Sequence, residues 1–249
     1  MHITILTLFP EMLEPFFTSS IMRRAVEKGI VSYTLINFRD YAEGVHRKVD
    51  DLPYGGGAGM VLMPDPLYKA LEAAGAREKR VIFPTPSGRV FNQQIAEELS
   101  REEELVFICG HYEGMDQRVI DEFVDDELTI GDYVLTAGET STAVIVDAVF
   151  RLIEGVITEE SLEDESFNGF LLEYPQYTRP ERYCLKSVPE VLSSGHHRHI
   201  TQWRCEQRLV KTMLNRPDLL CDASLSIEER RTLLTILERK DRKWTLSGL

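Results

Sequence analysis

The stretch Leu105–Gly114, which reads LVFICGHYEG, places an unbroken apolar run directly before a loop of glycine and polar residues. An apolar run without polar interruption is typical of a strand that is buried on both faces of a sheet. The same change from apolar strand to small or polar loop occurs where Arg80–Phe83 leads into Pro84–Gly88 and where Glu127–Ile130 leads into Gly131–Leu135. The three segments therefore indicate a parallel sheet covered by helices.

The rest of the first 155 residues continues this pattern. Two further apolar runs, Ile3–Phe9 and Ser32–Phe38, are predicted strands. Helical patterns lie between the strands, and proline or asparagine marks the start of two of them. The expected helices span about 11–28, 64–75, 92–101, 116–123 and 140–153. The alternation of strands and helices predicts the α/β class.

The composition excludes several classes of protein. Of the 249 residues 43% are hydrophobic and 28% charged, which argues against disorder, collagen and coiled coil. Met1–Phe9 lacks a basic leader and a cleavage site, and no apolar run is long enough to span a bilayer. The four cysteines are too scattered for a zinc ribbon or a redox pair. We therefore expect reduced thiols, a cytoplasmic location and no membrane partner.

The three loops that follow the strands are candidates for one binding site. In an open α/β sheet, ligands bind beyond the carboxyl ends of the strands, so the loops are expected to enclose one small cofactor. Each loop taken alone is more typical of an ordinary turn. The predicted cofactor-binding residues are Pro84, Thr85, Pro86, Gly110, Tyr112, Glu113, Gly114, Ile130, Gly131, Asp132, Tyr133, Val134, Leu135 and Gly138.

A glycine-rich segment, YGGGAG at Tyr54–Gly59, is a second candidate. So many glycines indicate backbone conformations or close approaches that a Cβ atom would forbid. The segment has neither the spacing of a dinucleotide fingerprint nor a phosphate-binding Gly-Lys-Ser/Thr. Cations and carboxylates at His46–Asp51 precede it, although a flexible surface loop is an equally simple interpretation. The residues predicted here to bind substrate are His46, Asp50, Tyr54, Gly55, Gly56, Gly57 and Gly59.

Charge divides the chain unequally. The formal net charge is −13, but residues 1–175 carry −18 and residues 176–249 carry +5. A basic tail on an acidic body suits an enzyme that holds a polyanion with one part and performs chemistry with another. Two domains of unlike composition would explain the same numbers.

The basic tail contains two long helical patterns, Gly195–Leu214 and Ser226–Trp244. The histidines at 196, 197 and 199 cannot place three ligands on one helical face, so we predict no metal site there. Basic and aromatic residues on the first pattern suit a phosphate backbone, and we assign Arg198, Arg204 and Arg208 to substrate binding. A solvated helix face with Trp203 in the core is the alternative.

One arginine and two carboxylates are candidates for catalysis. Arg151 ends the helical pattern at 140–153, and Asp164 and Glu165 follow in an acidic stretch that indicates a linker. An arginine can stabilise an oxyanion, and a carboxylate can remove a proton. From the residues alone, a surface arginine and solvated linker charges are the simpler interpretation.

Taken together, these motifs resemble the bacterial tRNA (guanine-N1)-methyltransferases of the knotted SPOUT class over nearly the whole chain. The resemblance is carried by Leu8–Met12, Val49–Asp51, Pro53–Gly57, Cys109–Gly110, Tyr112–Gly114, Ile130–Leu135 and Tyr177–Pro180. It implies a trefoil-knotted parallel-sheet domain at 1–157, a rare exception to the rule against threaded chains. It also implies a flexible linker at 158–175 that carries the base, and a small all-helical tRNA-binding domain at 176–249.

The resemblance implies transfer of a methyl group from S-adenosylmethionine (AdoMet) to N1 of guanine 37 in the anticodon loop of tRNA, when another guanine precedes it. Guanine N1 carries a proton, so the reaction needs a base and a donor for charge on the neighbouring carbonyl oxygen. Arg151 would be that donor. The family base is an Asp directly before Ser-Phe; here Glu165 holds that place and Asp164 precedes it, so both stand as candidates.

Three further expectations come from the same resemblance. The protein is expected to be a homodimer, in which the linker and tail of one subunit act on cofactor held by the other. It is also expected to need Mg²⁺, although no residue in the sequence marks the ligands of that ion. The anticodon loop suits such an enzyme because its bases are already partly unstacked.

Two functions from other classes remain as alternatives. In the first, the tail helices form a helix-turn-helix and the protein is a nucleic-acid-binding regulator whose α/β part senses a ligand. In the second, Asp164 and Glu165 form a hydrolytic carboxylate pair. The second ranks last, because adjacent residues in an extended segment usually point apart.

Overall fold

The computed structural model describes residues 1–158, 166–167 and 170–238. The chain divides into two compact units, Met1–Thr158 and Glu159–Leu249, which we call unit 1 and unit 2. Within the described ranges, no helix combines the length and the apolar character needed to cross a membrane.

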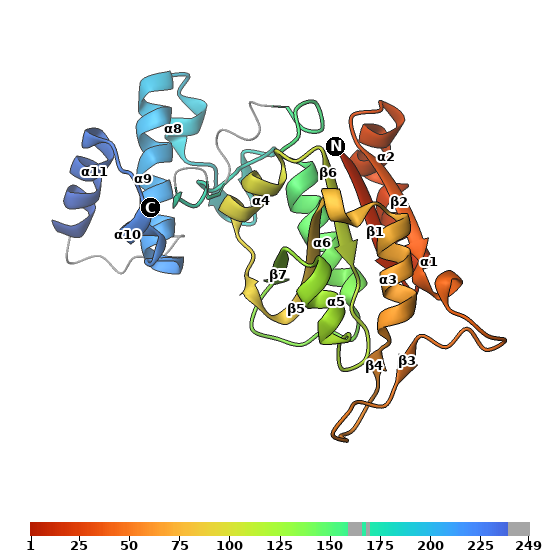
Figure 1. The fold of residues 1–249 in the computed structure, drawn as a ribbon. Helices are drawn as coiled ribbons and strands as arrows, with labels where there is room; N and C mark the ends of the chain where they lie inside the picture. The colour runs from red at the N-terminus through yellow and green to blue at the C-terminus, as the bar shows by residue number, and fades with distance from the viewer. Residues whose placement is uncertain (159–165, 168–169, 239–249) are drawn as a thin grey trace. The chain divides into compact units, whose positions relative to one another are not determined.

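A five-stranded parallel sheet forms the centre of unit 1 (Figure 1). The strand order is β2-β1-β6-β5-β7, so the chain starts next to one edge, crosses over to β5, fills the central position with β6 and ends at the other edge with β7. The bounds are β1 His2–Thr7, β2 Ser32–Asn37, β5 Arg80–Val90, β6 Glu104–Ile108 and β7 Asp126–Thr129. All five predicted strands and the α/β class are confirmed.

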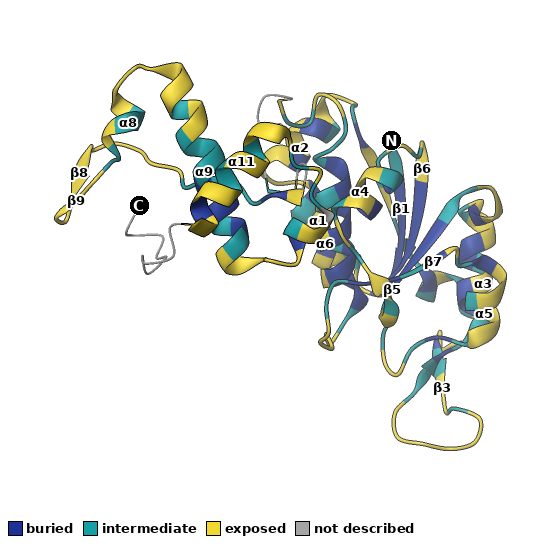
Figure 2. Ribbon diagram, turned by 90° about the vertical axis from the view of Figure 1, so that its left-hand side faces the viewer, coloured by how far each residue is buried: buried dark blue, intermediate teal, exposed yellow. Residues whose placement is uncertain are grey.

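Helices cover both faces of this sheet. Side chains along β6 alternate, so that Leu105 and Phe107 pack in one core cluster while Val106 and Ile108 pack in the other. The first cluster includes α1 Pro10–Phe17, α2 Ser20–Glu27, α4 Gln93–Leu99 and α6 Gly138–Phe150. The second includes α3 Pro64–Ala73 and α5 Gln117–Phe123. Burial on both faces, expected from the apolar runs, is visible in Figure 2.

The single helix expected at 11–28 is wrong, because the structure has two helices there. Thr18 ends α1, and its Oγ1 donates a hydrogen bond of 2.8 Å to the carbonyl oxygen of Glu14. The backbone N–H of Thr18 donates to the same carbonyl at 3.0 Å, so both groups of Thr18 close the last turn of α1. Ser20 then has φ 52°, a left-handed conformation that turns the chain before α2 continues.

The loop expected directly after Phe83 is also wrong in part, because β5 continues to Val90. Leu128 of β7 pairs with both Pro84 and Arg89, so residues 85–88 form a bulge between two paired parts of one strand. Pro84 directly before the bulge and Pro86 within it have no N–H to donate to a sheet, which suits an interruption of the pairing there. The segment therefore leaves the sheet, as expected of a binding loop, but returns to it.

Short elements complete unit 1. A 3₁₀ helix, η1 Phe38–Tyr41, leads to the antiparallel pair β3 Asp50–Asp51 and β4 Val61–Leu62. A second 3₁₀ helix, η2 Ala76–Glu78, follows α3. The glycine-rich segment is the connection between β3 and β4.

Unit 2 combines a hairpin with helices. Its elements are β8 Arg182–Tyr183, β9 Lys186–Ser187, α8 Glu190–Ser193, α9 His197–Asn215, α10 Leu219–Asp222 and α11 Ile227–Glu238. The described core cluster is small and consists of Leu171, Leu209, Val210 and Ile236. The expectation of an all-helical tail missed the hairpin, whose turn residues Cys184 and Leu185 lack the usual glycine or asparagine.

Candidate active site

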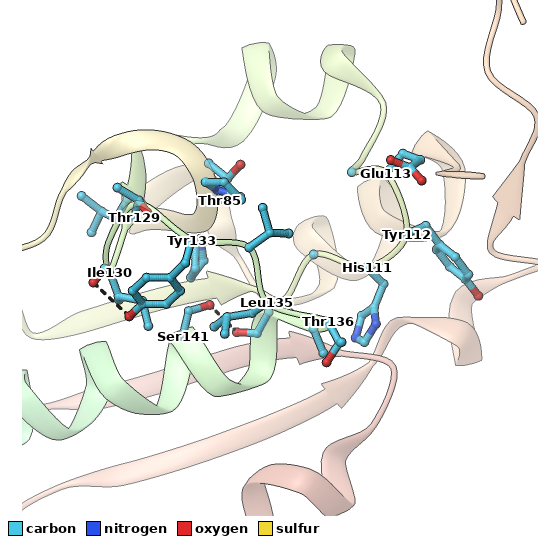
Figure 3. Close-up of a pocket in the computed structure, with 18 residues that line it drawn as sticks. Thr85, His111, Tyr112, Glu113, Thr129, Ile130, Tyr133, Leu135, Thr136 and Ser141 are labelled. Carbon is cyan, nitrogen blue, oxygen red and sulfur yellow. Dashed lines mark hydrogen bonds between the residues drawn. The ribbon is translucent and has the colours of Figure 1, made fainter. Parts of the chain in front are cut away.

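A pocket of about 270 Å³ lies at the bulge of β5 and beyond the carboxyl ends of β6 and β7 (Figure 3). Twelve of the fourteen predicted cofactor residues line it, and only Gly131 and Asp132 do not. Six lining residues were not predicted, namely His111, Leu128, Thr129, Thr136, Ala137 and Ser141. The structure thus brings the three strand-end loops together around one cavity, as the sequence analysis expected.

Two glycines allow the chain to close this pocket. The backbone N–H of Gly138, the first residue of α6, donates a hydrogen bond of 2.9 Å to the carbonyl oxygen of Gly110. A Cβ atom on Gly138 would lie only 2.5 Å from the backbone nitrogen of Gly110. No other residue permits such an approach, so glycine at 138 lets the start of α6 lie against the loop after β6.

The buried carboxylate of Glu139 connects the strands and loops next to the pocket. Glu139 is 1% exposed, and its Oε1 accepts hydrogen bonds from Thr7 Oγ1 and, at 2.7 Å, from His111 Nε2. Burial by itself would raise the pKa of Glu139, but the hydrogen bonds from His111 and Thr7 outweigh it and hold this pKa below its usual range. Glu139 is therefore ionised at neutral pH and joins β1, the loop after β6 and α6.

The glycine-rich segment adjoins the pocket. The N–H of Glu113 donates to the carbonyl oxygen of Met60 at 3.0 Å, and the N–H of Leu62 donates to that of Gly114 at 2.9 Å. Gly59, at φ 87°, lies so close to Glu113 that a Cβ would come within 2.4 Å of that carboxylate. The residues that directly follow the segment, Met60 and Leu62, are thus hydrogen-bonded to a loop assigned to the cofactor, and Gly59 lies against the same loop.

The other residues of that segment differ in exposure. Asp50 is half-buried in β3, whereas His46 and Tyr54 are exposed. Gly55, Gly56 and Gly57 follow Tyr54 in the same connection and all have positive φ.

The three arginines assigned to tRNA lie on α9 of unit 2. Arg198 is exposed, but Arg204 and Arg208 are half-buried. The Arg204 guanidinium lies 4.6 Å from the ring centroid of Tyr174, within the range of a cation–π contact. Of the three arginines Arg198 is the exposed one, whereas the guanidinium Nε atoms of Arg204 and Arg208 are buried.

The catalytic candidates lie apart from the pocket or outside the described residues. Arg151 caps the carboxyl end of α6, whereas Gly138 at the amino end of the same helix lines the pocket. At 1.5 Å per residue, these two residues are separated by about 20 Å. Asp164 and Glu165 fall in 159–165, outside the described residues. The described residues contain no group of three His, Cys, Asp or Glu side chains that could hold a metal ion.

The fold and the pocket define an α/β protein with a small-ligand site at the carboxyl edge of a parallel sheet. Comparison with known proteins identifies the family. The family model described as tRNA (Guanine-1)-methyltransferase TrmD matches residues 1–222, and the chain belongs to this family. The resemblance drawn from the motifs is confirmed.

Three curated relatives, each named tRNA (guanine-N(1)-)-methyltransferase, agree with this assignment. The chain is 60% identical to that of Treponema denticola over 220 residues, which cover 88% of this chain and 90% of the relative. It is 50% identical to that of Treponema pallidum over 241 residues, covering 97% and 96%. It is 52% identical to one from Staphylococcus epidermidis over 237 residues, covering 94% and 97%.

Proposed function

We propose that this protein transfers the methyl group of AdoMet to N1 of guanine 37 in tRNA. Membership of the tRNA (guanine-1)-methyltransferase family supports the reaction. The observation that carries the proposal is the pocket shared by three strand-end loops, because a methyltransferase needs a site for its methyl donor.

The residues of the pocket fit AdoMet. Apolar side chains from the third loop, Ile130, Val134 and Leu135, would hold an adenine, and the Glu113 carboxylate would attract a positively charged group. Gly110 and Gly138 leave the nearby backbone uncovered by side chains. When bound, AdoMet supplies a methyl group made electrophilic by its sulfonium. The pocket's own contribution is to hold and orient that group.

The proposed catalytic roles fall on Arg151, which does not line the pocket, and on two carboxylates that lie outside the described residues. Glu165 or Asp164 would remove the proton of guanine N1, and Arg151 would donate hydrogen bonds to the guanine carbonyl oxygen as charge develops there. The exposed Arg198, with Arg204 and Arg208, would hold the tRNA backbone. The glycine-rich segment would contact the substrate beside the cofactor.

The position of Arg151 supports a homodimer with shared active sites. About 15 Å of helix separates Arg151 from Ser141, the lining residue of α6 nearest to it, which is too far for its side chain to touch a base at the methyl donor of its own subunit. The partner subunit's Arg151 would complete each site instead. The trefoil knot of the family is part of the same proposal, and the close approach of Gly138 to Gly110 supports it.

The function is tested by transfer of radiolabelled methyl from AdoMet to unmodified tRNA transcripts. One transcript carries guanine at positions 36 and 37, and the other carries adenine at 37. Label in the first alone is expected. Assays with and without a chelator test the Mg²⁺ requirement that the family resemblance implies. Label in neither transcript, with Mg²⁺ present and AdoMet binding verified by calorimetry, contradicts the proposal.

Shared sites are tested with mixed dimers. One subunit carries Arg151→Ala and the other carries Leu135→Arg, which fills the pocket; both homodimers should be inactive. With two sites related by twofold symmetry, the mixed dimer should recover about half of the wild-type turnover if Arg151 acts across the interface. No recovery in a mixed dimer that still binds AdoMet means that Arg151 acts within its own subunit.

A further inference from the structure

Thr7, His111 and Glu139 form a hydrogen-bonded chain beside the pocket that the proposed reaction does not yet use. Thr7 ends β1, His111 follows β6, and Glu139 lies in the first turn of α6. The Glu139 carboxylate is almost completely buried and accepts from both of the other side chains. Burial of a carboxylate is costly unless it is paired and hydrogen-bonded, and the bonds from Thr7 and His111 meet that requirement here.

The hydrogen bonds determine which nitrogen of His111 carries the proton. An ionised carboxylate has only acceptors, so Nε2 of His111 must donate to Glu139. The Thr7 hydroxyl is oriented in the same sense, because its oxygen accepts from the N–H of Phe9 at 2.9 Å and its proton goes to Glu139. In the neutral ring, Nδ1 is then left without a proton and can only accept a hydrogen bond.

The ring is also fixed in place beside the cavity. His111 lines the pocket, its side chain is 10% exposed, and its ring centroid lies 5.2 Å from that of Phe9. In Figure 3, His111 and Glu113 leave the same loop in different directions, so they contribute to different parts of the wall. Among the described residues, none donates a hydrogen bond to Nδ1 of His111.

We propose that Nδ1 of His111 accepts a hydrogen bond from a hydroxyl or amino group of the nucleoside ligand in the pocket. Glu139 and Thr7 are positioning residues, which hold the ring and its tautomer. This inference rests on the proposed function and adds a ligand contact to it. It differs from a purely structural role, in which His111 matters only because its Nε2 ties the loop to Glu139.

Two conservative variants separate these roles. His111→Asn places an amide oxygen near the position of Nδ1 but loses the bond to Glu139. His111→Gln keeps a donor near the position of Nε2 but has no acceptor at Nδ1. We expect AdoMet to bind His111→Asn within about threefold of wild type and His111→Gln about tenfold more weakly, the range of one hydrogen bond.

Binding of AdoMet and of its demethylated product is measured by titration calorimetry on the full-length protein, with thermal unfolding as a check of folding. His2, on the same strand as Thr7 but at its opposite end, gives the matched control, and His2→Asn and His2→Gln should leave both affinities unchanged. The reverse order of the His111 variants, equal losses or no loss overturns the inference. Wild-type protein that binds neither ligand refutes the proposed function instead.

Glu139→Gln tests the same contact if either His111 variant fails to fold. In Glu139→Gln the amide can donate to Nε2, which lets the proton move to Nδ1 and removes the acceptor from the pocket. AdoMet should then bind about tenfold more weakly although His111 is intact. Unchanged affinity in folded Glu139→Gln overturns the inference as well.

Discussion

Units 1 and 2 differ in how much of each is buried. Two large clusters, of nineteen and sixteen described hydrophobic residues, pack on the two faces of the sheet in unit 1. The described cluster of unit 2 has four. Figure 2 shows the contrast, with mainly dark blue strands at the centre of unit 1 and mostly yellow and teal helices in unit 2. Unit 1 therefore has the larger reserve of stability.

The difference matches the proposed division of work. Burial of the Glu139 carboxylate costs free energy of folding. A large hydrophobic core can offset that cost, whereas a small core could not. Pocket geometry is therefore built where packing is dense. The basic residues that suit a polyanion lie in the part with the smaller core, where long side chains can reach solvent.

The largest expected effect is on the core of unit 1. Phe107 in the central strand β6 is fully buried, and Phe107→Ala should lower the free energy of unfolding by about 3–5 kcal/mol. Both tryptophans, Trp203 and Trp244, belong to unit 2. Urea unfolding followed by circular dichroism should shift, whereas the tryptophan fluorescence transition should move much less.

The control for this prediction is Tyr54→Ala, which removes a fully exposed ring from unit 1 and should change stability by less than about 0.5 kcal/mol. If circular dichroism and fluorescence shift together in Phe107→Ala, the two units unfold as one and the comparison of their stabilities fails.

Arg151→Ala comes next, because it tests whether a residue of unit 1 acts away from its own pocket. Loss of one donor to a developing oxyanion typically lowers turnover by about 10²–10³, or roughly 3–4 kcal/mol. Affinity for AdoMet should stay within about twofold, because Arg151 does not line the pocket. Single-turnover methylation and calorimetry measure the two quantities, and Arg101→Ala serves as an exposed control. Wild-type turnover in Arg151→Ala removes its proposed role.

Much of unit 1 could be predicted because its signals are local. Apolar runs such as Leu105–Ile108 gave the strands, and the change to glycine gave the pocket loops. The bulge at 85–88 could not be predicted, because Pro84 and Pro86 are typical of a loop and only the pairing of Leu128 with both sides shows otherwise. The division into two helices likewise has no local signal, because the residue with the left-handed φ at the turn is Ser20 and not a glycine.

The candidate site divides in the same way. Its loops were found from their position after strands, but the pairing of His111 with Glu139 joins residues 28 apart and has no signal in the spacing. In unit 2, the hairpin was missed because Cys184-Leu185 is not a turn signal, and its backbone conformation is imposed by pairing of the flanking strands. Tertiary contacts decided what the local sequence left open.

A third prediction concerns pH and the far end of the sheet. Asp126 is buried and accepts hydrogen bonds from Arg80 Nε at 2.7 Å and from an Arg89 guanidinium nitrogen at 2.6 Å. Burial alone would raise the pKa of Asp126, but these bonds outweigh it and lower the pKa. The carboxylate thus stabilises unit 1 above its ordinary pKa of about 4, and this contribution is lost as the pH falls further.

Asp126→Asn should therefore destabilise the protein at pH 7 by about 2 kcal/mol, below the ~3–5 kcal/mol of a fully buried pair because both arginines stay partly exposed. The loss should shrink as the pH is lowered toward 3. Urea titrations of wild type and Asp126→Asn at pH 7 and at pH 3 measure this difference in the free energy of unfolding. Asp40→Asn breaks the exposed pair with Arg47 and should cost less than about 1 kcal/mol. A wild-type pH dependence that survives in Asp126→Asn contradicts the assignment.

The smallest effect is expected in the hairpin of unit 2. Its two-residue turn has φ 46° at Cys184 and 65° at Leu185, a left-handed conformation that costs an L-residue about 1–2 kcal/mol. Leu185 is 90% exposed, so its side chain gains little packing in return. Leu185→Gly removes the steric cost but adds about 0.5–1 kcal/mol of chain entropy to the unfolded state. The hairpin should therefore gain up to about 1 kcal/mol.

Hydrogen exchange of the Val188 amide, which donates to the carbonyl oxygen of Glu181 at 2.9 Å, reports opening of this hairpin and should slow in Leu185→Gly. The same change at exposed Leu214, inside α9, should have the opposite sign and cost about 1 kcal/mol, because glycine weakens a helix. Faster exchange at Val188 would mean that Leu185 makes a contact that outweighs its backbone strain. Leu185→Gly and Leu214→Gly together thus test whether the hairpin of unit 2 contains backbone strain that side-chain packing does not offset.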